Sequence, residues 1–390
     1  DAPHLFGLGL VEMLADEITQ DLRGLREEAL RNANTSGQVV SVRLKSKGIK
    51  FGFLRANPDG SVDSSGVDGV NADLRVRPFF HQGGTISIRE FVVGALNAEM
   101  GMEAFDPDLA LAAAGERVVT PSGMVLDGAL DTIEGPPVSS ENDDVDLDGV
   151  TNEIPVSLVD HMEFYLLNYF KPGTYLASRS HQTDHRYKQG LKLMRKAYCT
   201  GCHVPDLVIE RDRRVADVET VFDSQQGIFN HLFATASPLF VEGEGDPSLK
   251  TPVGDRFVVY NIFADFKRHD LGPAFWERNF DGTVTKDFLT EPLWGVGSTS
   301  PYGHDGRSIN LREVILRHGG EARRSRNAFL ALSHDQQEHV IEFLQALVLF
   351  SPPDTASNLN PGDPQAPGFP QEGHGSIDLS VLFNDPSDPE

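Results

Sequence analysis

The spacing of hydrophobic positions predicts several helices and one β-hairpin. Apolar residues recur at helical intervals in residues 12–32, 86–100, 155–169, 184–198 and 333–350. Alternating apolar residues at 39–44 and 49–54 flank a Lys-Ser-Lys-Gly turn and predict the hairpin. The stretch 204–256 shows neither period and is expected to form long loops. We therefore predict a mainly α fold with long loops and a small β-hairpin.

Composition and charge narrow the class of protein. Hydrophobic residues make up 39% and charged residues 24% of the 390 residues, as in an ordinary folded protein. No apolar run approaches the roughly 20 residues that cross a bilayer. Acidic residues outnumber basic ones by 58 to 34, a formal charge of -24 that repels phosphate backbones and argues against nucleic acid as a partner. The same charge would attract a basic protein, or it merely keeps the chain soluble.

Both cysteines of the chain stand in one motif, Cys199-Thr200-Gly201-Cys202-His203. The chain therefore has no disulfide framework. In C-x-x-C-H motifs the two thiols add to the vinyl groups of a haem, which brings the adjacent histidine to one face of the iron. We predict one covalently bound haem c held by Cys199 and Cys202, with His203 as an axial iron ligand, at the end of the helix 184–198.

Two other kinds of site use paired cysteines. A zinc site would need two further ligands close by, and the next histidine after His203 is His231. A thioredoxin-like dithiol would call for a βαβ setting and needs no histidine. Haem is the favoured interpretation of the three. Covalent haem attachment normally follows export, so we expect a mature periplasmic or otherwise exported chain, although no signal peptide is visible at Asp1.

The chain contains an internal repeat. Residues 301–313 match residues 78–90 without a gap at a spacing of 223, and residues 293–297 echo residues 5–9. Both longer copies predict a turn and a capped helix, begun by Ser308 or its counterpart Thr85. Because only the later copy follows a C-x-x-C-H motif, we expect the earlier copy to be the distal half of a second haem module. Its haem-attaching half would lie on a companion chain or have been lost; chance similarity of two turn–helix units is the alternative.

The repeat and the composition give a domain prediction. Residues 1–135 are expected to form a partial cytochrome c-like module, and residues 136–350 a cytochrome c haem module with its motif at 199–203. Residues 351–390 are rich in Pro, Gly and Asp and are expected to be disordered or to lie on a partner.

With these motifs the chain resembles the bacterial di-haem cytochrome c peroxidase superfamily, and within it the branch of di-haem or thiol oxidoreductase-like proteins. The matching segments follow the family's order: residues 5–12, 148–154, 199–205, 268–273, 292–295, 302–307 and 318–322. Family members usually carry two C-x-x-C-H motifs, whereas this chain has one. Peroxidase activity would thus require a second haem supplied by another chain. Relatives also tend to have Met where Leu271 stands.

The resemblance implies that His318 is the second axial ligand. It follows an apolar helix face, and Gly319 and Gly320 would end that helix and let the backbone approach closely. His269, or an open or Met-ligated iron, is the alternative. His304 is expected to hydrogen-bond a haem propionate or a loop carbonyl. Iron held by two histidines would be six-coordinate, low-spin and of low potential, suited to electron transfer.

Two further residues gain candidate roles from the resemblance. Glu99 matches the distal-pocket acid of the peroxidases across a one-residue gap, and a carboxylate there could move the proton that O–O cleavage requires. The alternative is an exposed glutamate at a helix end. Trp294 stands where an indole could relay electrons between haems, with a plain core aromatic as the alternative.

An acidic segment suggests a cation site. Asp144, Asp146 and Asp148 alternate ahead of a turn glycine, as in Ca²⁺-binding loops. Pro155 occupies the place of the usual twelfth-position glutamate, so Asn152 or Glu153 would have to substitute. Peroxidases of the resembling family also carry calcium. The alternative is a solvated acidic linker.

Three functions fit these predictions. The first is an electron-transfer or peroxidase-type oxidoreductase subunit that works with a redox partner protein, a cytochrome or another electron carrier. The second is a non-catalytic haem subunit that scaffolds a larger periplasmic redox complex. The third is a zinc-binding adaptor.

Overall fold

The computed structural model describes residues 4–133, 135, 138–169, 173–174, 181–214 and 256–349. The chain divides into two compact units. Unit 1 comprises Asp1–Phe6, Phe170–Leu207 and Val259–Glu390, and unit 2 comprises Gly7–Tyr169 and Val208–Val258. The predicted tail 351–390 and most of the predicted loop 204–256 lie outside the described residues.

The predicted mainly α, cytochrome c-like fold class is wrong. Of the described residues 38% are helical and 16% lie in strands, which form several small antiparallel sheets, so the fold is mixed α and β. Most of these strands are only two or three residues long. So short a strand shows no alternation of apolar and polar residues, and its pairing depends on partners that are distant in sequence. Periodicity therefore detected the longer helices and the hairpin at 39–54, and missed the short strands.

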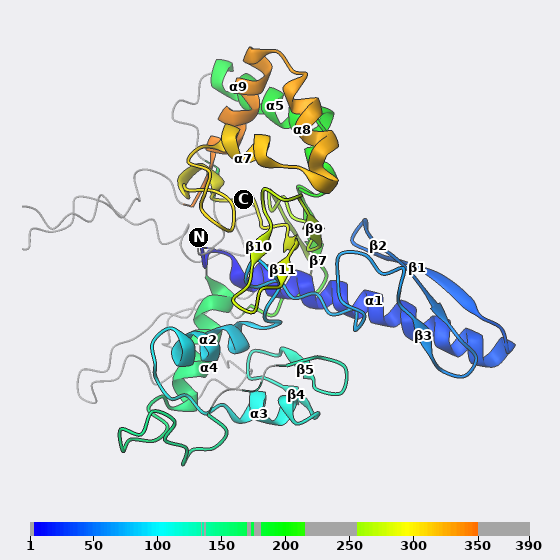
Figure 1. The fold of residues 1–390 in the computed structure, drawn as a ribbon, viewed down its shortest axis with the longest axis vertical. Coiled ribbons are helices and arrows are strands. Elements are labelled where there is room, and N and C mark those ends of the chain that lie inside the picture. Colours follow the sequence, from blue (N-terminus) through cyan, green and yellow to red (C-terminus); the bar gives the residue numbers. More distant parts are fainter. Residues whose placement is uncertain are drawn as a thin grey trace, which may run out of the picture. The chain divides into compact units, whose positions relative to one another are not determined.

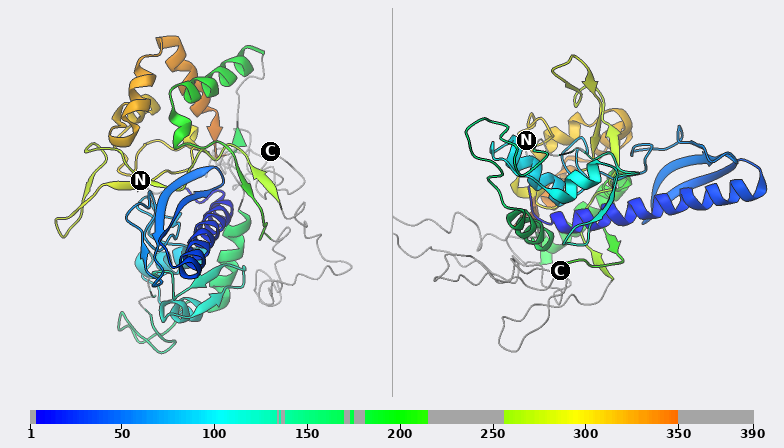
Figure 2. Two further views of the ribbon diagram at one scale, coloured as in Figure 1. Left: turned by 90° about the vertical axis from the view of Figure 1, so that its right-hand side faces the viewer. Right: turned by 90° about the horizontal axis from the view of Figure 1, so that it is seen from below.

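Unit 2 begins with a long helix that packs along an antiparallel sheet (Figures 1 and 2). The helix is α1 (Leu8–Ser36), and the sheet has the order β1 (Val40–Ser46), β2 (Ile49–Ala56), β3 (Val62–Asp63). The predicted hairpin is confirmed in β1 and β2; its turn places Lys47 and Gly48 at φ 47 and 86. The buried Leu14, Ile18 and Leu22 recur every four residues on one face of α1.

The described residues of unit 2 after this sheet also contain three helices and a short hairpin: α2 (Ile88–Ala98), α3 (Pro107–Ala113), β4 (Arg117–Val119), β5 (Val125–Asp127) and α4 (Val156–Asn168). A buried arginine joins the helices. The guanidinium of Arg89 on α2 lies 2.7 Å from Asp106, the N-cap of α3, and 2.6 Å and 3.0 Å from Asp160 and Glu163 of α4. Ion pairing thus compensates the burial of this charge.

The part of unit 1 that the structure describes contains four helices and three 3₁₀ turns: α5 (His181–Lys196), η1 (Cys199–Gly201), η2 (Val296–Ser298), α7 (Leu311–Arg317), η3 (Gly320–Ala322), α8 (Arg323–Leu330) and α9 (His334–Gln345). Helices α5 and α9 pack closely at Gly190. A Cβ atom there would lie 2.2 Å from the carbonyl oxygen of His339 and 2.5 Å from Cβ of Phe343, so only glycine allows this approach.

Unit 1 also holds three two-stranded antiparallel sheets: β6 (Gly173–Thr174) with β13 (Leu347–Val348), β9 (Arg268–Asp270) with β12 (Asp287–Leu289), and β10 (Glu277–Arg278) with β11 (Val284–Thr285). A fourth pair, β7 (Leu207–Ile209) with β8 (Phe257–Val259), forms where the chain passes between the units.

The two copies of the repeat adopt the same local structure. An isolated antiparallel bridge joins Phe79 to Thr85 in unit 2, and a bridge at the corresponding positions joins Tyr302 to Ser308 in unit 1. Each bridge closes a turn that leads into a helix, α2 in one unit and α7 in the other. The two copies therefore share backbone structure as well as sequence. Two segments that resembled each other only by chance would not need to share it.

The helix caps agree between the copies as well. Ser87 and Asn310 accept hydrogen bonds from the backbone N–H of Glu90 and Glu313, respectively, at 3.0 Å and 2.9 Å. Each glutamate in turn accepts a backbone N–H from the residue before the cap, at 2.8 Å and 2.9 Å. Each helix cap stands two residues after the residue predicted to begin the helix, Thr85 or Ser308. Those two residues form the bridges of the two copies instead.

Candidate haem site

The C-x-x-C-H motif follows the end of α5, as predicted. The chain turns at Tyr198, whose φ of 62 is left-handed, and enters η1 with Cys199 packed against the hydrophobic core of unit 1. Burial raises the pKa of the Cys199 thiol to about 11, so the thiol stays protonated at neutral pH. Catalytic dithiols have depressed pKa values instead, which argues against the thioredoxin-like alternative.

His203 is held in one orientation by the backbone. Its Nδ1 donates to the carbonyl oxygen of Phe263 at 3.1 Å, and since a carbonyl only accepts, the neutral ring keeps its lone pair on Nε2. Phe263 is buried with φ 52, a strained value for a bulky residue. The neighbouring bond from the backbone N–H of Ala264 to Val204 at 3.1 Å helps to fix this segment beside the motif.

His318 is oriented in the same way. It caps the C-terminal end of α7, and its Nδ1 donates to the carbonyl oxygen of Val314 at 2.7 Å, which leaves Nε2 with the lone pair. Phe275 contacts the ring edge-to-face at a centroid distance of 5.5 Å. Burial lowers the pKa of His318. The predicted close approach of the glycines is confirmed: a Cβ at Gly320 would lie 2.0 Å from the carbonyl oxygen of Asp270.

His318 affects the pKa of His203. Burial, and then the neighbouring His318, lower the pKa of His203 to about 4, so both imidazoles are neutral at pH 7 with Nε2 available. Neutral imidazole nitrogens are haem-iron ligands, and the thiols of Cys199 and Cys202 lie in the same unit. This donor set fits a haem c.

His269 is committed to carboxylates. Its Nδ1 lies 2.8 Å from Glu321 and its Nε2 lies 2.9 Å from the buried Asp265. Burial lowers the pKa of His269, but hydrogen bonds to Asp265 and Cys202 outweigh that effect and raise it to about 11. An imidazolium with both nitrogens engaged has no lone pair for iron.

The structure shows where zinc could bind if the zinc alternative held. Ligand atoms of Cys202, Asp265 and His269 lie within 4.8 Å of one another. Thiolate, carboxylate and imidazole are all zinc ligands. Cys202 would bind zinc as a free thiolate but would bind haem through a thioether. It cannot do both, so the two interpretations exclude each other.

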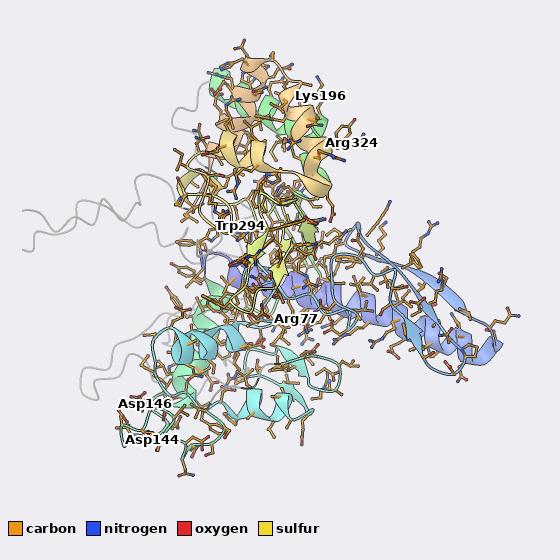
Figure 3. All side chains as sticks on the ribbon, in the orientation of Figure 1. Arg77, Asp144, Asp146, Lys196, Trp294 and Arg324 are labelled. Carbon is orange, nitrogen blue, oxygen red and sulfur yellow. The ribbon has the colours of Figure 1, made fainter. Side chains whose placement is uncertain are left out.

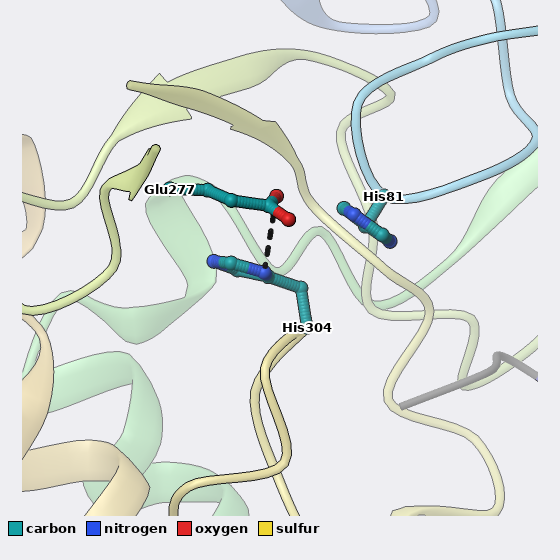
Figure 4. Close-up of side chains that lie close together, drawn as sticks. All are labelled: His81, Glu277 and His304. Carbon is teal, nitrogen blue, oxygen red and sulfur yellow. Dashed lines mark ion pairs between the residues drawn. The ribbon is translucent and has the colours of Figure 1, made fainter. Parts of the chain in front are cut away.

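His304 lies in a turn of unit 1 and binds a loop carbonyl. Its Nε2 is 2.7 Å from the carbonyl oxygen of Phe275, the second of the two partners expected for it. The ring stacks on Phe288 at 3.9 Å, and its Nδ1 lies 3.9 Å from the carboxylate of Glu277 (Figure 4).

An ion pair beside His318 was missed by the sequence reasoning. Arg317 contacts Asp305 at 2.7 Å and Ser308 at 2.9 Å, and its guanidinium covers the ring of Phe275 at 4.5 Å. Phe275 is the ring that contacts His318. The only signal in the sequence was the opposite charge of Asp305, in the turn, and Arg317, the last residue of the helix that follows.

The two residues predicted for chemistry lie in different surroundings. Trp294 is 2% exposed, and its carbonyl oxygen bonds His4 at 3.0 Å, the environment expected of a core aromatic (Figure 3). Glu99 belongs to unit 2 and is exposed at the C-terminal end of α2, as in its helix-end alternative.

The acidic segment of unit 2 gathers around a residue that sequence reasoning missed. Ligand oxygens of Asp144 and Asp146 lie within 4.8 Å of the buried carboxylate of Glu103 (Figure 3). All four predicted ligands also accept backbone N–H groups: Asp144 accepts those of Asp148 and Gly149 at 3.1 Å and 3.0 Å, and Asp146 accepts that of Asp148 at 3.2 Å. Asp148 accepts the N–H of Val150 at 2.7 Å, and Asn152 accepts that of Phe105 at 3.2 Å.

Comparison with known proteins gives one finding. Residues 213–347 match the model of a family described as "Di-haem oxidoreductase, putative peroxidase". The match covers little more than a third of the chain and begins after the C-x-x-C-H motif, but it includes His269, His304 and His318. It supports an oxidoreductase of the peroxidase type with haem as cofactor. No curated protein and no solved structure matches the chain.

No helix of the described part of the chain is long and apolar enough to span a membrane.

Proposed function

We propose that this chain is a c-type cytochrome that transfers electrons for a di-haem oxidoreductase. Cys199 and Cys202 would attach one haem c, and His203 and His318 would ligate its iron from the two faces. The observation that carries the proposal is the matched orientation of these histidines, each with Nδ1 bonded to a backbone carbonyl and Nε2 available. The match to the di-haem oxidoreductase family supports it independently.

The hydrogen bonds of His203 and His318 in unit 1 indicate which chemistry the site would support. When bound, haem supplies a one-electron redox centre. Hydrogen bonds to Phe263 and Val314 fix both imidazoles before iron arrives, which lowers the reorganisation that ligation requires. With His203 and His318 both holding it, the haem would supply electron transfer rather than peroxide cleavage. The exposed position of Glu99 agrees with this division.

The partners follow from the charge and the sequence. A formal charge of -24 favours a basic redox protein as the partner and predicts that the rate of electron exchange falls as ionic strength rises. Reaction with peroxide would take place at a second haem held by a companion chain. We place the protein outside the cytoplasm because covalent haem attachment follows export.

The test begins with intact mass and a pyridine haemochrome spectrum of the purified full chain. We expect one covalent haem in the wild type and none in the Cys199→Ser/Cys202→Ser double variant, whereas Thr200→Ser, a control in the same motif, keeps it. A colourless protein with both thiols open to alkylation, or one equivalent of zinc in place of haem, would refute the proposal.

A second measurement separates electron transfer from a scaffolding role. The reduced chain is mixed with an oxidised basic cytochrome, and the transfer is followed by stopped-flow absorbance at several salt concentrations. Salt-dependent transfer supports the proposal. A haem that is stably bound but exchanges no electrons with any carrier would instead indicate the non-catalytic scaffold.

A further inference from the structure

Basic residues gather in two segments of unit 1. Residues 185–205 and 322–334 contain no Asp or Glu, although the chain as a whole has 58 acidic residues and a formal charge of -24. The two segments carry eight Lys and Arg, three of them in the second half of α5 and three in α8. The C-x-x-C-H motif lies inside the first segment. The net charge of the chain therefore does not describe the surroundings of the proposed haem site.

The cations at the end of α5 and at the start of α8 have no counter-charge. Lys192, Arg195 and Lys196 lie on one face of α5, because helical residues three and four positions apart are neighbours. Arg323 and Arg324 begin α8. All five residues are exposed, and within the described residues none of them forms an ion pair with a carboxylate. They leave a region of unit 1 with unbalanced positive charge.

Helix stability does not account for all of these charges. Other arginines of unit 1 do form ion pairs, and three of them lie within 2.7 Å of a carboxylate: Arg186, Arg312 and Arg317. The dipole of α5 favours Arg195 and Lys196, which stand in its last turn. The dipole of α8 disfavours Arg323 and Arg324, which stand in its first turn. The α8 pair is therefore unfavourable in the free chain, as expected of a surface that a negative partner covers.

These five cations, together with Tyr198, form what we call the basic surface, and it adjoins the C-x-x-C-H motif. The guanidinium of Arg324 covers the ring of Tyr198 at 3.9 Å, and Tyr198 directly precedes Cys199. Lys196 ends α5 two residues before Tyr198 (Figure 3). Tyr198 is 50% exposed, and Gly201 inside the motif is exposed as well. A partner on the basic surface would thus contact the segment that carries the haem-attaching thiols.

We propose that the basic surface docks an electron-carrier protein with an acidic surface. Unpaired cations attract such a partner and orient it before contact. Arginine and tyrosine are also enriched at protein interfaces. This proposal rests on the proposed function, since docking here serves electron transfer only if haem is bound at the motif. The basic partner of the proposed function would instead bind the acidic remainder of the chain, so electron donor and acceptor would use surfaces of opposite charge.

The experiment uses the haem-loaded full chain and a plant-type [2Fe–2S] ferredoxin chosen for an acidic surface. Reduced ferredoxin has a low potential, so one electron passes from its cluster to the ferric haem of the chain. Stopped-flow absorbance follows this transfer. Calorimetry measures the binding of oxidised ferredoxin, so docking is tested even where no electron passes. We expect both rate and affinity to fall as salt rises to about 1 M, where charges are screened beyond about 3 Å.

Three double variants make the test specific. Lys196→Glu/Arg324→Glu reverses two exposed charges and should slow transfer and weaken binding by about tenfold or more at low salt, with no difference from the wild type at about 1 M. Lys196→Arg/Arg324→Lys keeps both charges and should behave as the wild type does. Arg31→Glu/Lys50→Glu makes the same change in net charge at exposed sites of unit 2 and should alter either quantity by less than about threefold.

The oxidised basic cytochrome serves as a second probe, and its rate should not fall in Lys196→Glu/Arg324→Glu. Absence of salt-dependent ferredoxin binding by the wild type, or wild-type binding in Lys196→Glu/Arg324→Glu, would overturn the proposal. Equal losses in the two glutamate variants would overturn it as well, because net charge alone would then attract the carrier.

Vesicles of anionic phospholipid test another negative partner. If Lys196→Glu/Arg324→Glu lost affinity for vesicles while it kept that for ferredoxin, the basic surface would be a membrane site and the proposal would be wrong. The proposed function fails separately. A chain that binds ferredoxin through this surface but contains no covalent haem would refute the proposed function and leave the docking surface in place.

Discussion

His203 and His318 share one mode of hydrogen bonding, in which each ring donates from Nδ1 to a main-chain carbonyl, at 3.1 Å and 2.7 Å. The acceptors are Phe263, 60 residues after the first histidine, and Val314, four residues before the second. Backbone acceptors cannot turn away as side chains can, so they hold both Nε2 atoms in place. The site is thus organised by the chain itself.

Replacement of His318 should change the spin state of the haem. His318→Ala removes one of the two proposed axial ligands, so the visible and EPR spectra should change from low-spin to high-spin iron. His318→Met should keep a low-spin spectrum and raise the reduction potential, because a thioether ligand favours the ferrous state. His185→Ala, an exposed histidine of α5, serves as control and should leave both unchanged. A low-spin, two-histidine spectrum in His318→Ala would show that the ligand is another residue.

Removal of the buried arginine should destabilise unit 2 strongly. Arg89→Ala leaves Asp106 and Glu163 buried without their counter-charge, and we expect a loss of about 3–5 kcal/mol in the free energy of unfolding. The control is Arg55→Ala, which breaks the exposed pair with Asp63 and should cost less than about 1 kcal/mol. Urea unfolding followed by circular dichroism measures both. Equal effects of the two variants would contradict the role given to Arg89.

Glu291 should make unit 1 less stable at alkaline pH. Burial raises its pKa from 4.5 to about 7, and among the described residues its Oε1 has no hydrogen-bond partner. A raised carboxyl pKa means that the folded state holds the proton more tightly, so its stabilising contribution is complete below pH 4.5 and is lost as the pH rises through 7.

Glu291→Gln cannot ionise and should remove this dependence. At pH 8 the variant should be more stable than the wild type by about 1–3 kcal/mol, and the difference should vanish near pH 4. Denaturant midpoints across that range measure the effect. A variant that is less stable than the wild type at pH 8 would mean that the carboxylate has a favourable partner.

The repeated caps should contribute equally. Ser87→Ala and Asn310→Ala each remove a side chain that accepts the N–H of a glutamate at the third helical position, so each should cost about 1 kcal/mol. Thr35→Ala near the end of α1, whose exposed hydroxyl donates to the carbonyl oxygen of Arg31 in the preceding turn, should change stability by less than about 0.5 kcal/mol. A large cost at one cap and none at the other would show that the two copies differ in structural role.

The sequence by itself determined the local features of this protein. Helical periodicity located α1, α2, α4, α5 and α9 to within a few residues, and alternation located the hairpin of β1 and β2. The motif at residues 199–203 predicted the haem-attaching residues, and the resemblance to the di-haem peroxidases predicted His318, because both rest on contiguous patterns. Each of these signals depends on residues that are near one another in the chain.

Only the tertiary structure decided which distant groups meet. The acceptor for His203 is the backbone carbonyl oxygen of Phe263. Every residue type has such a carbonyl, so the sequence does not indicate which one accepts the bond. Glu103 joins the acidic loop from 41 positions before Asp144, and Glu321 bonds His269 from 52 positions further along the chain. The short strands depend likewise on remote pairing. Contacts of this kind form when the chain folds, through packing and burial rather than through any spacing in the sequence.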